Sequence, residues 1–233
     1  MNDTAKPLAD SSERIGGPIP AALVSLTLLL ALPAWAGVPT ITVTTVQDVQ
    51  DGDVSSIASL LASPGPDGQI SYREAVAAAE NSGGGAEIVF SVSGTTFFVV
   101  EPPVLAGGGI AIRGGGAITF EGSQLANGES GILITSANNV IDGLTIVNFP
   151  DSGVKINGPL ATDNIIRGCR IGTDGRRLFP LQPYGISING GATRNEIGGV
   201  NEGDGKKSED QSHGCPSRRR GAVVSGFDHP ASI

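Results

Sequence analysis

Asn139-Val-Ile-Asp-Gly143 decides the fold, because its Asn-x-Ile-x-Gly pattern returns twice further along the chain. The other copies are Asn164-Ile-Ile-Arg-Gly168 and Asn195-Glu-Ile-Gly-Gly199, which start 25 and then 31 residues later. Internal repeats of this length are typical of folds that stack one supersecondary unit on the next. The unit is too short for a strand–helix–strand crossover and has no helical period, so it fits one coil of a strand solenoid.

Each copy follows a Gly-x-x-Ile stretch that begins at Gly131, Gly153 or Gly185. Side chains alternate between the two faces of a strand, so Ile141 and Leu144, three residues apart, would point to opposite faces of one straight strand. Such a strand cannot bury both. A bend at Gly143 removes this conflict, because glycine tolerates the corner conformation. Each coil then has three short faces. The pattern predicts an all-β, right-handed parallel β-helix with a short N-terminal capping helix.

The three asparagines are expected to be structural. Equivalent residues of neighbouring coils lie about 4.8 Å apart, so Asn139, Asn164 and Asn195 would form a column at one corner. Their amides could hydrogen-bond along that column, which offsets the cost of burying a polar group. The same structural role is assigned to the glycines that close the copies, Gly143, Gly168 and Gly199.

Composition and charge narrow the function. Glycine supplies 35 of 233 residues and aromatic residues only 4%, as expected where columns of Ile, Val and Leu form the core. Residues 37–204 carry 17 acidic and 8 basic side chains (net −9), whereas residues 205–233 carry 3 and 5 (net +2). An acidic body argues against a nucleic-acid partner, which needs a basic face, and is compatible with an extracellular surface and with calcium.

Residues 1–36 have the pattern of an export signal. Ala21 to Leu32 form an apolar run of signal-peptide length, too short to span a membrane. Ala34 and Ala36 match the A-x-A cleavage pattern, which predicts a mature chain beginning at Gly37. We therefore expect a secreted or cell-surface protein without a transmembrane span in the mature chain. The alternative is that the run is a buried helix of an intracellular protein.

Residues 37–85 are expected to form an N-terminal cap region. A strand, a short helix and a longer helix are predicted over Thr40–Val46, Val54–Ala62 and 75–80. Ser71 and Glu74 form a capping box at the start of the longer helix, and the glycines at 83–85 end it. Such a helix would cover the apolar end and the unpaired strand edges of the first coil.

Residues 86–200 are expected to hold the coils. Before the three clear repeats, strands are predicted over 87–90, 96–100, 110–112 and 118–120, with glycine corners at 107–109 and 114–116. The alternation stops after Gly199, so residues 201–233 are expected to be a disordered tail. A coil stack that ends without a cap suggests that the chain is a truncated or frameshifted remnant of a longer β-helix protein.

One short segment supports a resemblance to a known family. Ile70-Ser-Tyr-Arg-Glu-Ala75, with the acidic stretch before it and Ile88-Val-Phe90 after it, resembles the N-terminal module of bacterial surface proteins named for the sequence CSLREA. Ile70 and Tyr72 stand where that name has Cys and Leu. The coils, with their Asn-x-Ile-x-Gly turns and Ile171-Gly-Thr-Asp174, resemble pectate-lyase-like right-handed β-helices, and the whole resemblance covers Thr40 to Gly199. The resemblance implies export, a β-helix and a surface or secreted role, but no single reaction.

Catalytic and metal-binding residues are few. Both histidines, His213 and His229, lie in the tail, so the coils offer no Ser-His or Cys-His pair. Cys169 and Cys215 cannot form a disulfide framework, and Cys169 suits a buried column. Calcium is the one possible cofactor. Its candidate ligands are the turn carboxylates Asp48, Asp51, Asp53 and Asp67.

The enzymatic alternative depends on carboxylates or arginines on the outer face of adjacent coils. Stacking the repeats places Asp142 beside Arg167, and Thr145 beside Arg170. A cross-strand ion pair explains Asp142 and Arg167 better than catalysis does. The longer third coil inserts a loop, where Arg176, Arg177, Phe179 and Tyr184 could contact a glycan or pack on the coil.

These observations favour an exported β-helix that acts in adhesion, surface structure or glycan binding, with extracellular glycans or surface components as partners. A polysaccharide lyase or glycoside hydrolase is the alternative from a different class. The third hypothesis is that the chain is a non-functional remnant of a longer protein.

Overall fold

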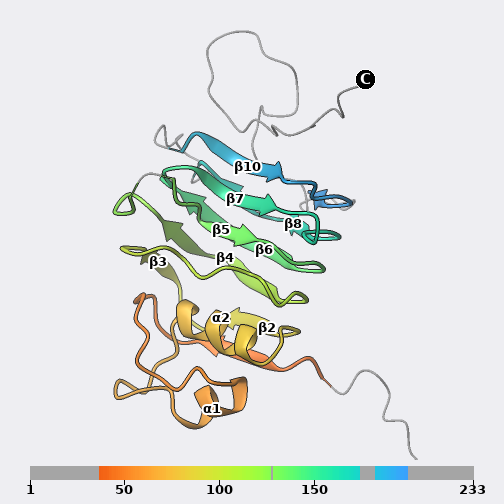
Figure 1. Ribbon diagram of the computed structural model, residues 1–233. Helices are drawn as coiled ribbons and strands as arrows, with labels where there is room; N and C mark the ends of the chain where they lie inside the picture. Colours follow the sequence, from red (N-terminus) through yellow and green to blue (C-terminus); the bar gives the residue numbers. More distant parts are fainter. Residues whose placement is uncertain (1–36, 127, 174–181, 199–233) are drawn as a thin grey trace, which may run out of the picture. The chain divides into compact units, whose positions relative to one another are not determined.

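Parallel strands dominate the computed structural model, which describes residues 37–126, 128–173 and 182–198. Every strand pair within these residues is parallel, and the strands stack in the order in which they occur along the chain (Figure 1). The expected all-β class is therefore confirmed. Among the described residues, no helix is both long and apolar enough to cross a membrane.

The strands fall into three sets, which we call faces. Face 1 consists of β1 (Thr40–Val43), β2 (Glu87–Phe90), the first part of β4 (Ala111–Glu121), the first part of β6 (Val140–Val147), β8 (Ile165–Arg167) and β11 (Glu196–Ile197). Face 2 consists of β3 (Gly94–Phe97), the second parts of β4 and β6, and β9 (Arg170–Ile171). Face 3 consists of β5 (Ile132–Ile134), β7 (Ser152–Asn157) and β10 (Tyr184–Asn189).

An isoleucine column holds face 1 together. Each strand of this face contributes one isoleucine in register with the next, namely Ile41, Ile88, Ile112, Ile141, Ile166 and Ile197. The first five are almost fully buried, and Ile197 is partly buried against the same core. Burial of each such side chain contributes about 1.5–3 kcal/mol, so the column is a main source of cohesion between successive coils.

Glycine makes the corner between faces 1 and 2. Gly143 and Gly168 have φ angles of 69° and 61°, in the left-handed region that favours glycine. In β4 the corner is made by Gly115 and Gly116, with a register shift between Arg113 and Ile118. We expected separate strands at 110–112 and 118–120. Instead β4 and β6 continue through the bend, because both of their halves pair with neighbouring strands.

Two helices precede the main run of strands. α2 (Tyr72–Asn81) begins with a complete capping box: Ser71 Oγ accepts from the Glu74 N–H at 3.1 Å, and Glu74 Oε2 accepts from the Ser71 N–H at 2.9 Å. α1 (Ile57–Ala62) starts later than the predicted residue 54, because Ser56 supplies its N-cap. α2 buries Tyr72 and four alanine or valine side chains against the core.

An aromatic cluster lies where α2 meets the first coils. The ring centroids of Tyr72 and Phe120 are 4.6 Å apart, and those of Phe98 and Phe120 are 5.2 Å apart. Phe149 joins the cluster through Phe98. The predicted strand 96–100 is instead β3 (Gly94–Phe97). It ends at Phe97, and the carbonyl oxygens of Val100 and Glu101 accept from the Arg73 guanidinium instead of from a neighbouring strand.

Candidate functional site

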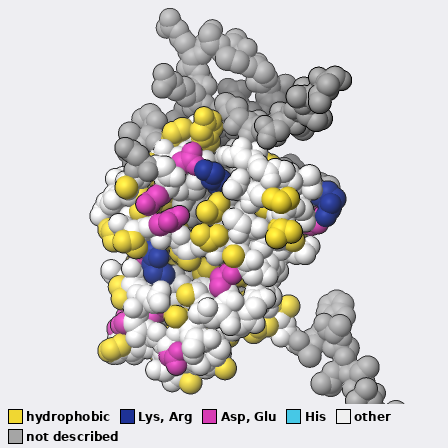
Figure 2. Space-filling model, in the orientation of Figure 1, with side chains coloured by type: hydrophobic (Ala, Val, Ile, Leu, Met, Phe, Trp, Pro, Cys, Tyr) yellow, Lys and Arg dark blue, Asp and Glu magenta, His cyan; other side chains and the backbone are white. Residues whose placement is uncertain are grey.

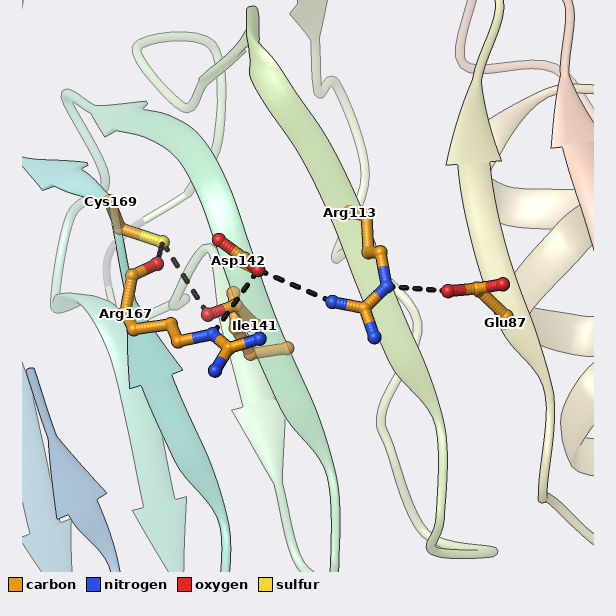
Figure 3. A network of polar contacts seen from close by, with 6 residues as sticks. All are labelled: Glu87, Arg113, Ile141, Asp142, Arg167 and Cys169. Atoms are coloured by element: carbon orange, nitrogen blue, oxygen red, sulfur yellow. Dashed lines mark hydrogen bonds and ion pairs between the residues drawn. The ribbon is translucent and has the colours of Figure 1, made fainter. Parts of the chain in front are cut away.

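A row of charged side chains runs across the outer surface of face 1, and we call it the charged ladder. Its members are Glu87, Arg113, Asp142 and Arg167 (Figure 3). Arg113, Asp142 and Arg167 occupy equivalent positions in consecutive coils, because β4 pairs with β6 and β6 with β8 in that register. Glu87 reaches Arg113 from β2, two positions before the register partner of Arg113. The ladder thus crosses four strands.

Asp142 is shared between two guanidinium groups. Its Oδ2 accepts from Arg113 Nη1 at 3.3 Å and from Arg167 Nε at 3.2 Å. The side chains remain 30–41% exposed, so water screens these ion pairs and each adds little stability. The arrangement holds charged groups in fixed positions at the surface, where a ligand can reach them.

The structure brings Asp142 and Arg167 together and places Arg170 elsewhere. Arg170 lies on β9, beyond the Gly168 corner, and pairs in register with Thr145 on face 2. Two ladder members were missed from the sequence. Arg113 could have been found, because Ile110-Ala-Ile-Arg-Gly114 has the repeat pattern with Ile in place of Asn. Glu87 carries no such signal, since it contacts Arg113 diagonally.

The asparagines beside the ladder form a hydrogen-bonded column at the corner that precedes face 1. Asn139 Nδ2 donates to Asn164 Oδ1 at 2.9 Å, and Asn164 Nδ2 donates to Asn195 Oδ1 at 2.9 Å. The side-chain oxygens also accept backbone N–H groups of the preceding coil, from Ile110, Asn139 and Asn164 in turn. Asn139 and Asn164 are fully buried. Gly199 lies outside the described residues.

Comparison with protein families identifies the architecture. Residues 79–206, more than half of the 233-residue chain, match the family model for a right-handed beta helix region. The chain belongs to this family. The match begins near the end of α2 and includes every strand described above except β1, so the β-helix assignment and the parallel pairing agree. A search of curated proteins and a search of solved structures found no match.

Left-handed residues precede each asparagine of the β-helix corner. Asn138, Asp163 and Arg194 have φ angles of 61°, 57° and 57°. Such angles are uncommon outside glycine, and they recur here because each coil turns in the same way. Asp163 and Arg194 are also joined by a bidentate ion pair at 2.8 and 2.6 Å. Hydrogen bonding to Arg194 lowers the pKa of Asp163.

The four candidate calcium ligands have different environments. Asp48 is 2% exposed and forms a bidentate ion pair with Arg73, so its charge is already compensated. Asp53 and Asp67 accept backbone N–H groups two residues ahead, in turns of their own. Asp51 has a raised pKa, first through burial and then through repulsion from Asp67 and Glu74. In the described part of the chain, no group of three His, Cys, Asp or Glu side chains is arranged to hold a metal ion.

In the Ser71-Tyr-Arg-Glu74 segment, Ser71, Arg73 and Glu74 each make specific polar contacts. Ser71 Oγ donates to Val49 O in addition to capping α2. Glu74 is 1% exposed, and its Oε1 accepts the N–H groups of Asp51 and Gly52 at 2.9 and 2.7 Å. Arg73 joins Asp48 to the carbonyls of residues 100 and 101. The segment therefore connects the loop at residues 48–53, which we call the acidic loop, to α2 and to the first coil.

The inserted loop is only partly within the described residues. Arg176, Arg177 and Phe179 lie outside them, and so do Cys215 and both histidines. Tyr184 starts β10 in register with Ser152 and is 38% exposed, so its ring is accessible on face 3 of the β-helix. It is distant in the fold from the charged ladder, which belongs to face 1.

Cys169 follows the Gly168 corner and is buried in the core at 2% exposure. Burial raises the pKa of its thiol to about 11, which suppresses the thiolate form that nucleophilic chemistry needs. Its Sγ points toward the carbonyl oxygens of Ile141 and Arg167 (Figure 3). The residue behaves as a small core side chain. Among the described residues, the charged ladder remains the best candidate for contact with a ligand.

Proposed function

We propose that this β-helix is an exported surface or secreted protein whose face 1 binds an extended, hydroxyl-rich ligand such as a glycan, in adhesion or surface structure. The observation that carries the proposal is the charged ladder, which presents alternating acidic and basic groups across four strands, three of them in register. Each guanidinium has five N–H donors, of which the ladder uses two on Arg113 and one on Arg167. Carboxylate and guanidinium groups together suit the hydroxyl groups of a sugar chain.

Binding accounts for this site better than catalysis does. Asp142 accepts from two guanidiniums, and Arg113 lies between the two carboxylates of the ladder (Figure 3). A glycoside hydrolase needs two carboxyl groups that flank the scissile bond. A lyase needs a free base. Within the described residues, no histidine stands beside the ladder to serve as one.

The N-terminal region supports a finer assignment in the same proposal. We take the coils as a closed solenoid and α2 as its cover, because α2 buries Tyr72 within the aromatic cluster and Glu80 accepts the N–H groups of Ala106 and Gly107. The contacts of Ser71, Arg73 and Glu74 are consistent with a CSLREA-type module, in which these three residue types recur. Residues 1–36 would then be the export signal.

A glycan array with purified full-length protein tests the binding function. We expect wild-type protein to bind a subset of glycans without turnover, and Arg113→Ala/Arg167→Ala to bind at least about tenfold more weakly. Arg194→Ala is the matched control, because it removes an exposed arginine that is ion-paired with Asp163 and is not part of the ladder. Equal binding by the ladder variant and wild type would refute the site. Turnover that Asp142→Ala abolishes would favour the enzymatic alternative.

Export is tested separately by expression with residues 1–36 intact. Sequencing of the secreted protein should give Gly37 as the first residue. Retention of the full chain inside the cell would contradict export and would leave the binding result unaffected.

A further inference from the structure

An exposed apolar group lies at the edge of face 2, apart from the charged ladder. Phe97, Val99 and Val100 are 51%, 59% and 55% exposed, while Phe98 between them is fully buried. Val49 on the neighbouring acidic loop is 44% exposed. We call these four residues the apolar patch. Hydrophobic side chains that reach the surface on the face shown in Figure 2 form small groups, with acidic and basic side chains between them.

Arg73 holds the two halves of the apolar patch in place. Its guanidinium donates to Asp48, next to Val49, and to the carbonyl oxygens of Val100 and Glu101. Ser71 Oγ fixes Val49 through its carbonyl oxygen. Both loops are therefore held by polar contacts of Ser71 and Arg73 rather than by packing of the valines themselves. An apolar surface that is held rigid but left uncovered is typical of an interaction site.

The charge around the patch indicates the kind of partner. Residues 37–101 carry eight acidic side chains and one basic side chain, Arg73, a net charge of −7. That single base is already paired with Asp48. Glu101 directly follows the patch and is exposed, as are Asp51 and Asp53 of the acidic loop. A second copy of the chain would bring like charges together, which costs free energy.

We propose that the apolar patch docks a segment of another polypeptide in which apolar side chains are flanked by lysine or arginine. The apolar residues would cover Phe97, Val99 and Val100, and the basic residues would face Glu101 and the acidic loop. Apolar burial supplies most of the affinity in such an interface, and opposite charge speeds association and excludes acidic partners. This interaction is independent of the glycan-binding function of face 1.

Two synthetic ten-residue peptides test the proposal, one alternating valine with lysine and one alternating valine with glutamate. Fluorescence anisotropy with the full-length protein should show binding of the lysine peptide alone, weakening as salt is raised. Val99→Ser/Val100→Ser should weaken it at least about tenfold. Leu160→Ser is the matched control, since Leu160 is 75% exposed at a different corner of the coil, and it should change nothing. Equal melting temperatures would show that the variants are folded.

Four results would overturn the proposal. They are no binding of the lysine peptide, equal binding of the glutamate peptide, equal binding by the double-serine variant, and a wild-type dimer in sedimentation that the double-serine variant lacks. The apolar patch could also bind the chain's own basic tail, and the variant Arg218→Ala/Arg219→Ala/Arg220→Ala tests this. If this variant binds the lysine peptide at least tenfold more tightly than wild type, the tail occupies the patch. Unchanged binding supports an external partner.

Discussion

Asn164 shows how one buried residue joins three coils. Its Oδ1 accepts the N–H of Asn139 from the preceding coil, and its Nδ2 donates to Ser136 O in that coil and to Asn195 Oδ1 in the following coil. Asn164→Ala leaves the buried Asn139 N–H without an acceptor, at about 1–3 kcal/mol, and removes the two bonds that Asn164 Nδ2 donates, at about 1 kcal/mol each. We expect the free energy of unfolding to fall by about 3 kcal/mol, measured by urea denaturation.

Asn157→Ala is the control for this change. Asn157 ends β7 and is exposed, so its loss should alter the free energy of unfolding by less than about 0.5 kcal/mol. Similar losses for the two alanine variants would mean that the asparagine column contributes nothing beyond an ordinary surface amide.

Substitution of Tyr72, unlike that of Asn164, is not expected to lower the free energy of unfolding. Its ring is buried in the aromatic cluster, but its hydroxyl is buried with no hydrogen-bond partner, and burial raises the pKa of the phenol. Tyr72→Phe keeps the ring contacts and removes the unsatisfied group, so we expect stability to stay level or rise by about 1 kcal/mol. Thermal unfolding checks this. A clear loss of stability would reveal a polar partner, such as a bound water, that the phenol needs.

At the scale of elements, α2 depends on Glu74 more than a capping box alone would require. This carboxylate accepts three backbone N–H groups, from Ser71, Asp51 and Gly52. Glu74→Ala leaves all three without their acceptor, so we expect a loss of about 3 kcal/mol and faster proteolysis of the loop at 48–53. Glu74→Gln keeps one carbonyl oxygen and should lose less. Asp67→Asn, in an exposed turn, should behave as wild type.

The coils were predictable from local pattern, because each strand repeats the same apolar spacing. The glycine corner was predictable because one straight strand cannot bury both Ile141 and Leu144, so the chain must bend at Gly143. The contact between Asp142 and Arg167 was predictable because the two residues hold the same position in successive repeats. The same counting could have placed Arg113, whose coil has Ile110 where the others have asparagine. Contacts between unlike elements could not be counted in this way. The bonds from Glu80 to Ala106 and Gly107, and from Arg73 to Val100, join a helix to loops with no shared period.

At the scale of the whole molecule, the two ends of the described stack differ. The strands of the central coils are long, with β4 at 11 residues and β6 at 8, and the aromatic cluster lies on the α2 side of them. Strands β9 and β11 have only 2 residues each. In a stack where each coil contacts only its neighbours, stability is close to a sum of local terms. Opening should therefore be uneven along the chain.

Hydrogen exchange followed by mass spectrometry tests this gradient. We expect the slowest exchange in β4 and β6, which pair with each other along most of their length and with further strands on their other sides, and the fastest in β11. Phe120→Leu should speed exchange in α2, β3 and β4, where the aromatic contacts lie, and should leave β10 close to wild type. Uniform acceleration along the whole chain would mean that the coils open as one cooperative unit, contrary to nearest-neighbour stacking. The control, Thr119→Ser, lies in the same strand but faces outward, and should keep the wild-type profile.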